Sequence, residues 1–236
     1  MYGHRARIGY TSPPMVTEVF PYEFYRVAPP GVTLAFTTMS VLKVSAEEVK
    51  ESSNISLRAA IEMARTGVDL IVLGGAPVNL TAGVDGIDDL IRTTEKACRV
   101  PVTTSISAQL SALRVLGARR LAIVDLNLGP DAYEHLKHYG YEVMGVKSSG
   151  FGLVDVGRIG GDDVKRLARE AAKEYPEADT IVFRCAHWGT LEYIDELEQE
   201  LGRNVVSASQ AIIWHALRKV GVLEPIPGFG RLLQDH

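Results

Sequence analysis

The sequence is poor in cysteine, and this excludes several kinds of protein. Its 236 residues include only two cysteines, Cys98 and Cys185. Two thiols so far apart match no metal-binding spacing and cannot form the disulfide framework of a small secreted domain. We therefore expect reduced thiols, no metal and a cytoplasmic protein.

Long apolar runs and a strong charge of one sign are also missing. No segment approaches the roughly 20 apolar residues of a membrane helix, and the first residues lack the apolar stretch of a signal peptide. The formal net charge is -4, which indicates neither a nucleic-acid nor a membrane partner. With 46% hydrophobic and 23% charged residues, the chain is typical of a globular protein with one large domain or two small ones.

What the sequence does contain is an alternation of short apolar runs and helical patterns. The expected strands are 6–11, 32–36, 69–73, 101–103, 120–125, 141–146, 179–184 and 204–207. Examples of the expected helices are 46–66, 106–116, 130–139, 161–174, 190–201 and 208–220. Several strands are almost continuously apolar, as buried parallel strands are, so the pattern predicts βαβ units and a parallel sheet.

The pattern also has a crude internal symmetry. A helix, a buried strand and a turn run through 54–80 and again through 164–189, which puts GGAPVN and RCAHWG at equivalent strand ends. Ligands of open parallel sheets bind beyond the carboxyl ends of the strands. We expect two lobes, one of 1–112 together with 212–236 and the other of 113–211.

Cys185 is the first candidate for a functional residue. It follows a buried strand and is predicted to open the turn before a helix, where backbone N–H groups would stabilise a thiolate. His187 lies two residues on and could tune the thiol or relay its proton. Arg184 should point away from the thiol and is assigned to structure, as is Cys98, late in a helix.

Polar and glycine-rich turns at the other strand ends are weaker candidates. The two glycines of GGAPVN would let a ligand approach the backbone, although the turn has neither phosphate-loop spacing nor a Walker lysine. Hydroxyls such as Thr104 and Ser12 could cap helices or bind a carboxylate. Pro14 and Asn127 lie on equivalent turns and are interpreted in the same way.

Several motifs together resemble the aspartate/glutamate racemase superfamily, and within it the maleate isomerase and arylmalonate decarboxylase family. They are IGYTSPP, GVDLIVLGGAPVN, VPVTTSISAQLSALRVLGARRLAIV, the long stretch from ADTIVFRCAHWG to IIWHALR, and the terminal PGFGRLL. The resemblance covers nearly the whole chain. It implies two pseudo-symmetric, Rossmann-like α/β lobes, each with a four-stranded parallel sheet flanked by helices. It further implies an active site between the lobes that needs no cofactor.

The resemblance also implies roles for individual residues. Racemases and maleate isomerases use one cysteine from each lobe, whereas the decarboxylase keeps only the second, which protonates an enediolate after CO₂ leaves. Here Cys185 matches the second cysteine and Gly75 stands at the first. The sequence departs from the decarboxylase at Ala76 and Pro77, which replace two hydroxyl residues, and at Asn127, which replaces a tyrosine.

These observations predict an enzyme that moves a proton at the carbon next to a carboxylate. The expected reaction is decarboxylation of a small, substituted malonate-like dicarboxylic acid. Alternatives are a maleate-type cis–trans isomerase, a racemase with a second base other than cysteine, and a non-catalytic carboxylate-binding protein. The chain would act as a monomer or homodimer. The candidate residues are Cys185 and His187 for catalysis, and Ser12, Pro14, Gly75, Ala76, Thr104, Asn127 and Ala186 for substrate binding.

Overall fold

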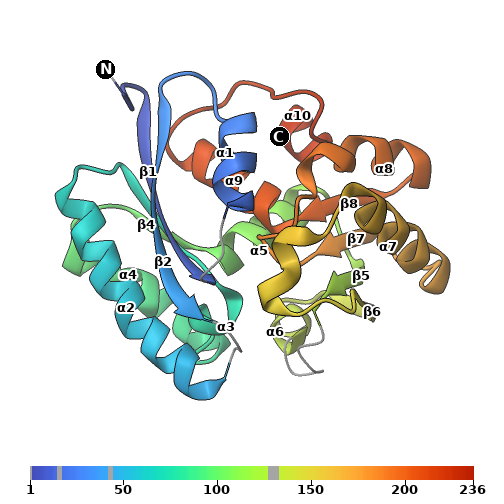
Figure 1. The fold of residues 1–236 in the computed structure, drawn as a ribbon, viewed down its shortest axis with the longest axis horizontal. Coiled ribbons are helices and arrows are strands. Elements are labelled where there is room, and N and C mark those ends of the chain that lie inside the picture. Colours follow the sequence, from blue (N-terminus) through green and yellow to red (C-terminus); the bar gives the residue numbers. More distant parts are fainter. Residues whose placement is uncertain (1, 15–17, 42–44, 127–132) are drawn as a thin grey trace. The chain divides into compact units, whose positions relative to one another are not determined.

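Two four-stranded sheets, all of whose neighbouring strands are parallel, form the core of the protein (Figure 1). The computed structural model describes residues 2–14, 18–41, 45–126 and 133–236. The strands of the first sheet are β1 (Ala6–Pro14), β2 (Val32–Val41), β3 (Leu70–Leu73) and β4 (Val102–Thr104). Those of the second are β5 (Arg120–Asp125), β6 (Glu142–Ser148), β7 (Thr180–Phe183) and β8 (Asn204–Ser207).

The two sheets have the same topology. Their strand orders are β2-β1-β3-β4 and β6-β5-β7-β8, so each of β1 to β4 has a counterpart four strands later. The predicted α/β fold with two four-stranded parallel sheets is therefore confirmed. All eight predicted strands are present, and six begin and end within two residues of the prediction; β1 and β2 run three and five residues further.

The chain forms two compact units, here called unit 1 and unit 2. Unit 1 comprises 1–108 and 215–223, and unit 2 comprises 109–214 and 224–236. The chain passes from one unit to the other within α5 (Ser105–Val115) and returns within α9 (Ala208–Lys219). The sequence prediction put 212–236 in the first lobe, which is wrong for the terminal segment 224–236.

Two buried polar side chains, one an acceptor and one a donor, explain why that segment belongs to unit 2. Glu198, only 2% exposed, accepts the backbone N–H groups of Val205 and Arg231. Gln210 donates its side-chain amide to the carbonyl oxygen of Phe229 at 2.6 Å. These bonds join α8 (Ile194–Leu201), β8 and α9 to the segment before α10 (Arg231–Asp235).

In unit 1, the long helix α2 (Ala46–Arg65) and α4 (Ile87–Cys98) pack together against the sheet. The shared core contains Ala60, Met63, Val68, Ile71, Leu73, Cys98 and Val102. Cys98 is 9% exposed, and its burial raises the pKa of its thiol, in agreement with the structural role predicted for it. The unit also contains α1 (Val19–Val27) and α3 (Ala76–Asn79).

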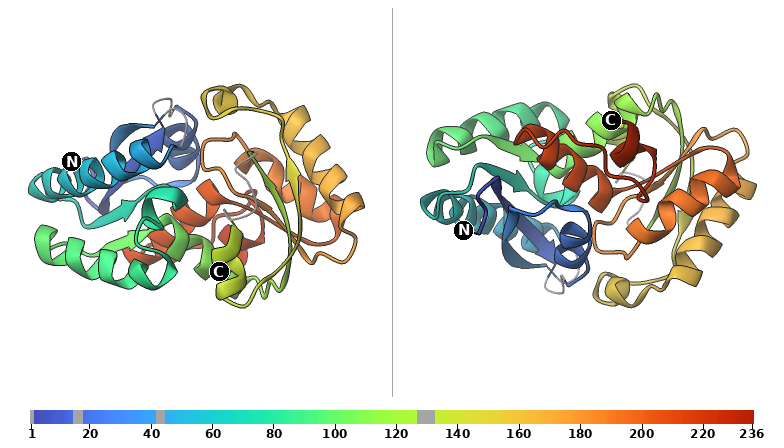
Figure 2. Two further views of the ribbon diagram at one scale, coloured as in Figure 1. Left: turned by 90° about the horizontal axis from the view of Figure 1, so that it is seen from below. Right: turned by 90° about the horizontal axis from the view of Figure 1, so that it is seen from above.

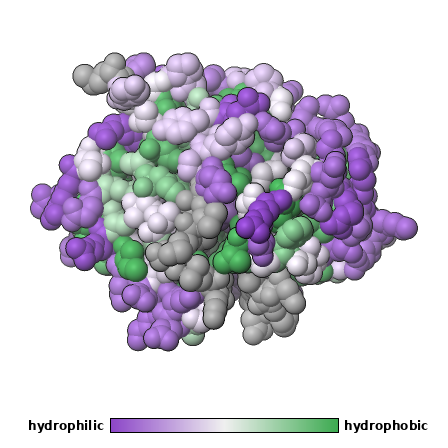
Figure 3. Space-filling model, viewed as in Figure 1, coloured by the Kyte–Doolittle hydropathy of each residue, from purple (hydrophilic) through white to green (hydrophobic). Residues whose placement is uncertain are grey.

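In unit 2, α7 (Gly161–Glu174) and α8 pack side by side on the sheet, as both views in Figure 2 show. The unit also contains α6 (Glu134–His138) and the 3₁₀ helices η3 (Leu153–Arg158) and η4 (Leu191–Tyr193). Hydrophilic side chains gather over the outer surface of α7 and α8 (Figure 3).

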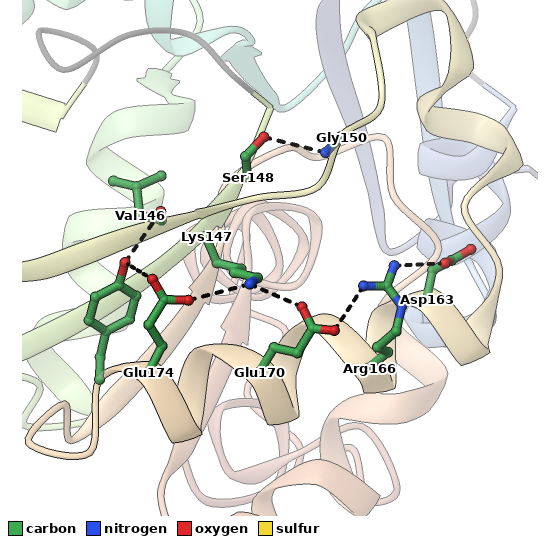
Figure 4. A network of polar contacts seen from close by, with 9 residues as sticks. Val146, Lys147, Ser148, Gly150, Asp163, Arg166, Glu170 and Glu174 are labelled. Atoms are coloured by element: carbon green, nitrogen blue, oxygen red, sulfur yellow. Dashed lines mark hydrogen bonds and ion pairs between the residues drawn. The ribbon is translucent and has the colours of Figure 1, made fainter.

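Part of that polar surface is an ion-pair network that ties α7 to the edge strand β6 (Figure 4). Lys147 lies within 3.3 Å of carboxylate oxygens of Glu170 and Glu174. Arg166 joins Glu170 to Asp163 on the helix. Since charged side chains on an edge strand discourage pairing with another chain, the network also protects this edge of the sheet.

Candidate active site

Gly75 and Cys185 occupy equivalent positions in the two sheets. Each is the second residue after the third strand in the sheet order, β3 or β7. The residue before each donates its N–H to the neighbouring strand: Gly74 to Thr11 O at 2.9 Å, and Arg184 to Val124 O at 3.1 Å. The predicted equivalence of the GGAPVN and RCAHWG turns is therefore confirmed.

Cys185 is half-buried in the turn that follows β7. Burial raises the pKa of its thiol to about 12, and the negative charge of Asp125 acts in the same direction. The backbone N–H of His187 and the guanidinium of Arg184 act against this shift and are outweighed. The thiol is therefore protonated at neutral pH and is suited to donate a proton.

The sequence prediction of a stabilised thiolate is thus wrong, and the local structure explains why. No helix starts at Cys185, because 185–190 form an irregular turn and η4 begins only at Leu191. A single backbone N–H, that of His187, bonds to the sulfur where several had been expected. One donor does not offset the desolvation of the sulfur.

The His187 side chain is 5% exposed, and burial lowers its pKa to about 4. Its imidazole is therefore neutral at pH 7 and cannot stabilise a thiolate as a cation. The prediction that His187 influences the thiol holds for its backbone N–H, which bonds to the Cys185 sulfur. Ala186, the residue in between, is buried.

A buried ion pair adjoins Cys185 in the chain. The Nε of Arg184 donates to Oδ2 of Asp125 at 2.8 Å, and the two side chains are 5% and 2% exposed. Asp125 also accepts the backbone N–H of Leu126 at 2.7 Å. The ring of Tyr133 lies 4.7 Å from the guanidinium, and its hydroxyl donates to Asp125 at 3.4 Å.

The sequence analysis assigned Arg184 to structure and did not consider Asp125 or Tyr133. A signal for the pair was present, because two continuous apolar strands end in residues of opposite charge, RLAIVD and TIVFR. Recognising it requires knowing that β5 and β7 are neighbours, which the strand order supplies.

The two glycines after β3 are required by close packing, and their role in the approach of a ligand stays a prediction. A Cβ at Gly74 would lie 2.1 Å from the carbonyl oxygen of Thr11. A Cβ at Gly75 would lie 2.1 Å from Cγ of Pro13, and Gly75 has a φ of +83°. The close neighbour of both glycines is thus strand β1 of the same unit, and a side chain at either position would require that strand to shift.

Thr104, the last residue of β4, is buried and caps helix α5. Its Oγ1 accepts the N–H of Ser107 at 3.0 Å and lies 2.8 Å from the Ser107 hydroxyl. Ser207 caps α9 in the same way at the end of β8, accepting the N–H of Gln210. The capping use that the sequence analysis considered is therefore the one observed for Thr104.

The remaining predicted residues are placed as follows. Ser12 is completely buried near the end of β1, and Pro14 is the last residue of that strand. Ala76 is half-buried and begins α3. Asn127 lies outside the described residues. In unit 1, β3 pairs with both β1 and β4, so Ser12, Gly75 and Thr104 lie at the same edge of one sheet.

The family model for arylmalonate decarboxylase matches residues 8–233. The chain belongs to this family.

Individual relatives agree with this assignment. The chain is 30% identical over 182 residues to arylmalonate decarboxylase of Bordetella bronchiseptica, covering 75% of each protein. It superimposes on the structure of unliganded arylmalonate decarboxylase with a TM-score of 0.83 and 28% identity, covering 97% of this chain and 98% of that one.

The fold also extends to an isomerase. The chain matches a C-to-S variant of the maleate cis–trans isomerase of Nocardia farcinica with a TM-score of 0.81. At 23% identity over 98% of this chain and 99% of that one, this likeness shows the fold alone. In that isomerase, a cysteine carries a covalently bound succinylcysteine intermediate. Maleate isomerase of Geobacillus stearothermophilus is 24% identical to the chain over 217 residues, so the relatives of this chain include an isomerase as well as a lyase.

Among the residues that the structure describes, no helix is both long and apolar enough to cross a membrane.

Proposed function

We propose that the protein is a cofactor-independent decarboxylase that acts on a small, substituted malonate-like dicarboxylic acid. The Cys185 thiol would deliver the proton that replaces the lost carboxylate. The observation that carries this proposal is the state of that thiol. Burial and Asp125 raise its pKa to about 12, so it is a proton donor and a poor nucleophile at neutral pH.

The reaction can be written as a balanced sequence. The bond between the α-carbon and one carboxylate breaks, CO₂ leaves, and the electron pair remains as an enediolate on the other carboxylate. The S–H bond of Cys185 then breaks and its proton forms a C–H bond at the α-carbon. Water returns a proton to the resulting thiolate. The His187 N–H, already bonded to the sulfur, stabilises that brief thiolate.

The substrate carboxylates need donors aimed at the developing charge. We assign this role to the backbone N–H groups of Gly75, Ala76 and Ala186, with the hydroxyls of Ser12 and Thr104 and the amide of Asn127. Pro14 would border the same region. In this assignment the Thr104 hydroxyl combines its capping bond with substrate binding, since a hydroxyl has two acceptor lone pairs and one proton.

Two features favour decarboxylation over the alternatives that need a second thiol or a thiolate. Gly75 stands at the position equivalent to Cys185, and a side chain there would have to displace Pro13. Addition of a thiolate to maleate would begin from the minor, ionised form of Cys185. Both features favour a reaction in which the Cys185 thiol delivers one proton.

The test is proton NMR in D₂O with substituted malonates, maleate, aspartate and glutamate. Cys185→Ala is the test variant and Cys98→Ala the control. We expect loss of CO₂ with deuterium at the product α-carbon for the natural protein and Cys98→Ala, and none for Cys185→Ala. Formation of fumarate from maleate would indicate that the protein is an isomerase and not a decarboxylase. Equal turnover by Cys185→Ala would contradict the catalytic assignment itself. Specific line broadening without turnover would indicate a binding protein.

A further inference from the structure

The ion pair between Asp125 and Arg184 includes the residue immediately before Cys185 in the chain, where it can act on the position and the charge of the thiol. Arg184 is joined to Cys185 by one peptide bond, and its N–H bonds to Val124 O of β5. Its side chain returns to Asp125, the last residue of β5. One residue is therefore held to the neighbouring strand by both its backbone and its side chain, immediately before the turn that carries the thiol.

A contribution to the stability of the fold does not by itself explain why this ion pair is buried here. Desolvation of two buried charges costs about as much as their attraction returns, and apolar replacements of buried pairs are often neutral or stabilising. Burial raises the pKa of Asp125, which is a sign of that cost, while Arg184 and two hydrogen bonds oppose the shift. A buried charge pair beside a thiol therefore calls for a role at the thiol.

We propose that Asp125 and Arg184 are positioning residues for Cys185: the pair anchors the end of β7 to β5 and sets the charge at the sulfur so that the thiol keeps its proton until a carbanion takes it. The carboxylate of Asp125 opposes a second negative charge nearby, and Arg184 limits that effect. Tyr133 fixes the pair through its ring and hydroxyl.

The other groups near the sulfur are consistent with this role. The His187 imidazole is neutral at pH 7, and burial together with Asp125 raises the pKa of Tyr133, so neither adds a charge. Among the residues that the structure describes, the charges that act on Cys185 are those of Asp125 and Arg184. The inference rests on the proposed role of Cys185, but its test uses the thiol alone and needs no substrate.

The experiment is the rate of carbamidomethylation of Cys185 by iodoacetamide at pH 8, followed by peptide mass spectrometry so that Cys98 is counted separately. Only the thiolate reacts, so the rate reports the ionised fraction. Asp125→Asn removes the negative charge that acts on the sulfur and should raise the rate about tenfold. Arg184→Gln leaves the carboxylate unopposed and should lower it about threefold.

Two further variants make the result decisive. Asp163→Asn removes a carboxylate that pairs with Arg166 on the surface of the same unit, and it should leave the rate within about twofold of the natural protein. The double variant Asp125→Asn/Arg184→Gln lacks both charges of this pair and serves if a single variant fails to fold. Because Asp125 outweighs Arg184 at the sulfur, it should react about threefold faster than the natural protein.

Opposite signs for the two single variants would support the inference, because simple loosening of the turn moves both rates upward. The inference would be overturned if the two single variants changed the alkylation rate in the same direction, or by no more than Asp163→Asn does. It would also be overturned if the double variant reacted no faster than the natural protein. A decarboxylation assay of Cys185→Ala separates this outcome from a failure of the proposed function. If Cys185→Ala turns over substrate normally while the alkylation rates change as expected, the charge relationship stands and the catalytic role does not.

Discussion

Pro13 occupies the space that a side chain at Gly75 would need: its Cγ lies 2.1 Å from the position of a Cβ there. Gly75 also has a φ of +83°, a conformation that costs an L residue about 1–3 kcal/mol. Two separate obstacles thus keep a side chain, and with it a second thiol, out of the turn after β3.

We therefore expect Gly75→Ala and Gly75→Cys to lower the free energy of unfolding by about 2–4 kcal/mol, measured by urea denaturation. Gly83→Ala is the matched control, because Gly83 has a φ of +77° and open space around a Cβ; it should cost only about 1 kcal/mol. Adding Pro13→Ala to Gly75→Cys should recover part of the loss. A Gly75→Ala protein as stable as Gly83→Ala would show that Pro13 moves aside easily.

Thr104→Val should destabilise the protein by about 1 kcal/mol, because the N–H of Ser107 loses its acceptor at the start of α5. Thr104→Ser keeps the oxygen and should remain close to the natural stability. If Thr104 also binds substrate, Thr104→Val should raise KM beyond the effect of Ser207→Ala, which removes the equivalent cap of α9. Equal KM values for these two variants would limit Thr104 to capping.

The buried His187 should make stability depend on pH. Its pKa is about 4 in the folded protein and near 6.5 when unfolded, so the unfolded chain takes up the proton first. The free energy of unfolding should therefore fall as the pH drops from about 6.5 to about 4, by up to about 3 kcal/mol. His187→Gln should flatten this slope in urea titrations, whereas His138→Gln, at an exposed position, should not. An unchanged slope in His187→Gln would assign the acid sensitivity to other groups.

Glu198→Ala should release the terminal segment, since it removes the acceptor of both the Val205 and the Arg231 N–H groups. We expect a loss of about 2–4 kcal/mol and rapid proteolytic cleavage within 224–230. Glu198→Gln keeps one oxygen and should show a smaller loss of stability and slower cleavage. Protease resistance of Glu198→Ala equal to that of the natural protein would mean that apolar contacts alone hold this segment.

The strands could be predicted from sequence because each is a short apolar run with a physical reason to be buried. TIVF and LIVL are buried at every position, as their composition predicts. Helix α1 was missed because VFPYEFYRV contains a proline and several aromatic or β-branched residues, which are weak helix formers. There the packing of Phe20 and Phe24 in the core outweighs local propensity.

The site was predicted less completely than the fold. The position of Cys185 and the equivalence of the GGAPVN and RCAHWG turns follow from the pattern of strands and turns, whereas the match of Gly75 to Cys185 was implied by the resemblance to the family. The pKa direction of the thiol does not, because it depends on burial and on Asp125, which is 60 residues away in sequence. The steric need for the glycines could likewise not be predicted, since the approach of Pro13 and Thr11 depends on how β1 and β3 pair.

The passage of the chain through α5 and α9 determines the order in which the protein can be completed on the ribosome. All four strands of the first sheet have been synthesised once the ribosome reaches Thr104. The Nε2 of His215 lies 3.1 Å from the buried Thr103 hydroxyl, yet His215 is synthesised 111 residues after Thr104. Unit 2 in turn lacks 224–236 until those residues have been synthesised. Neither unit can finish folding as an independent N-terminal domain during synthesis, so the two must reach their native states almost together.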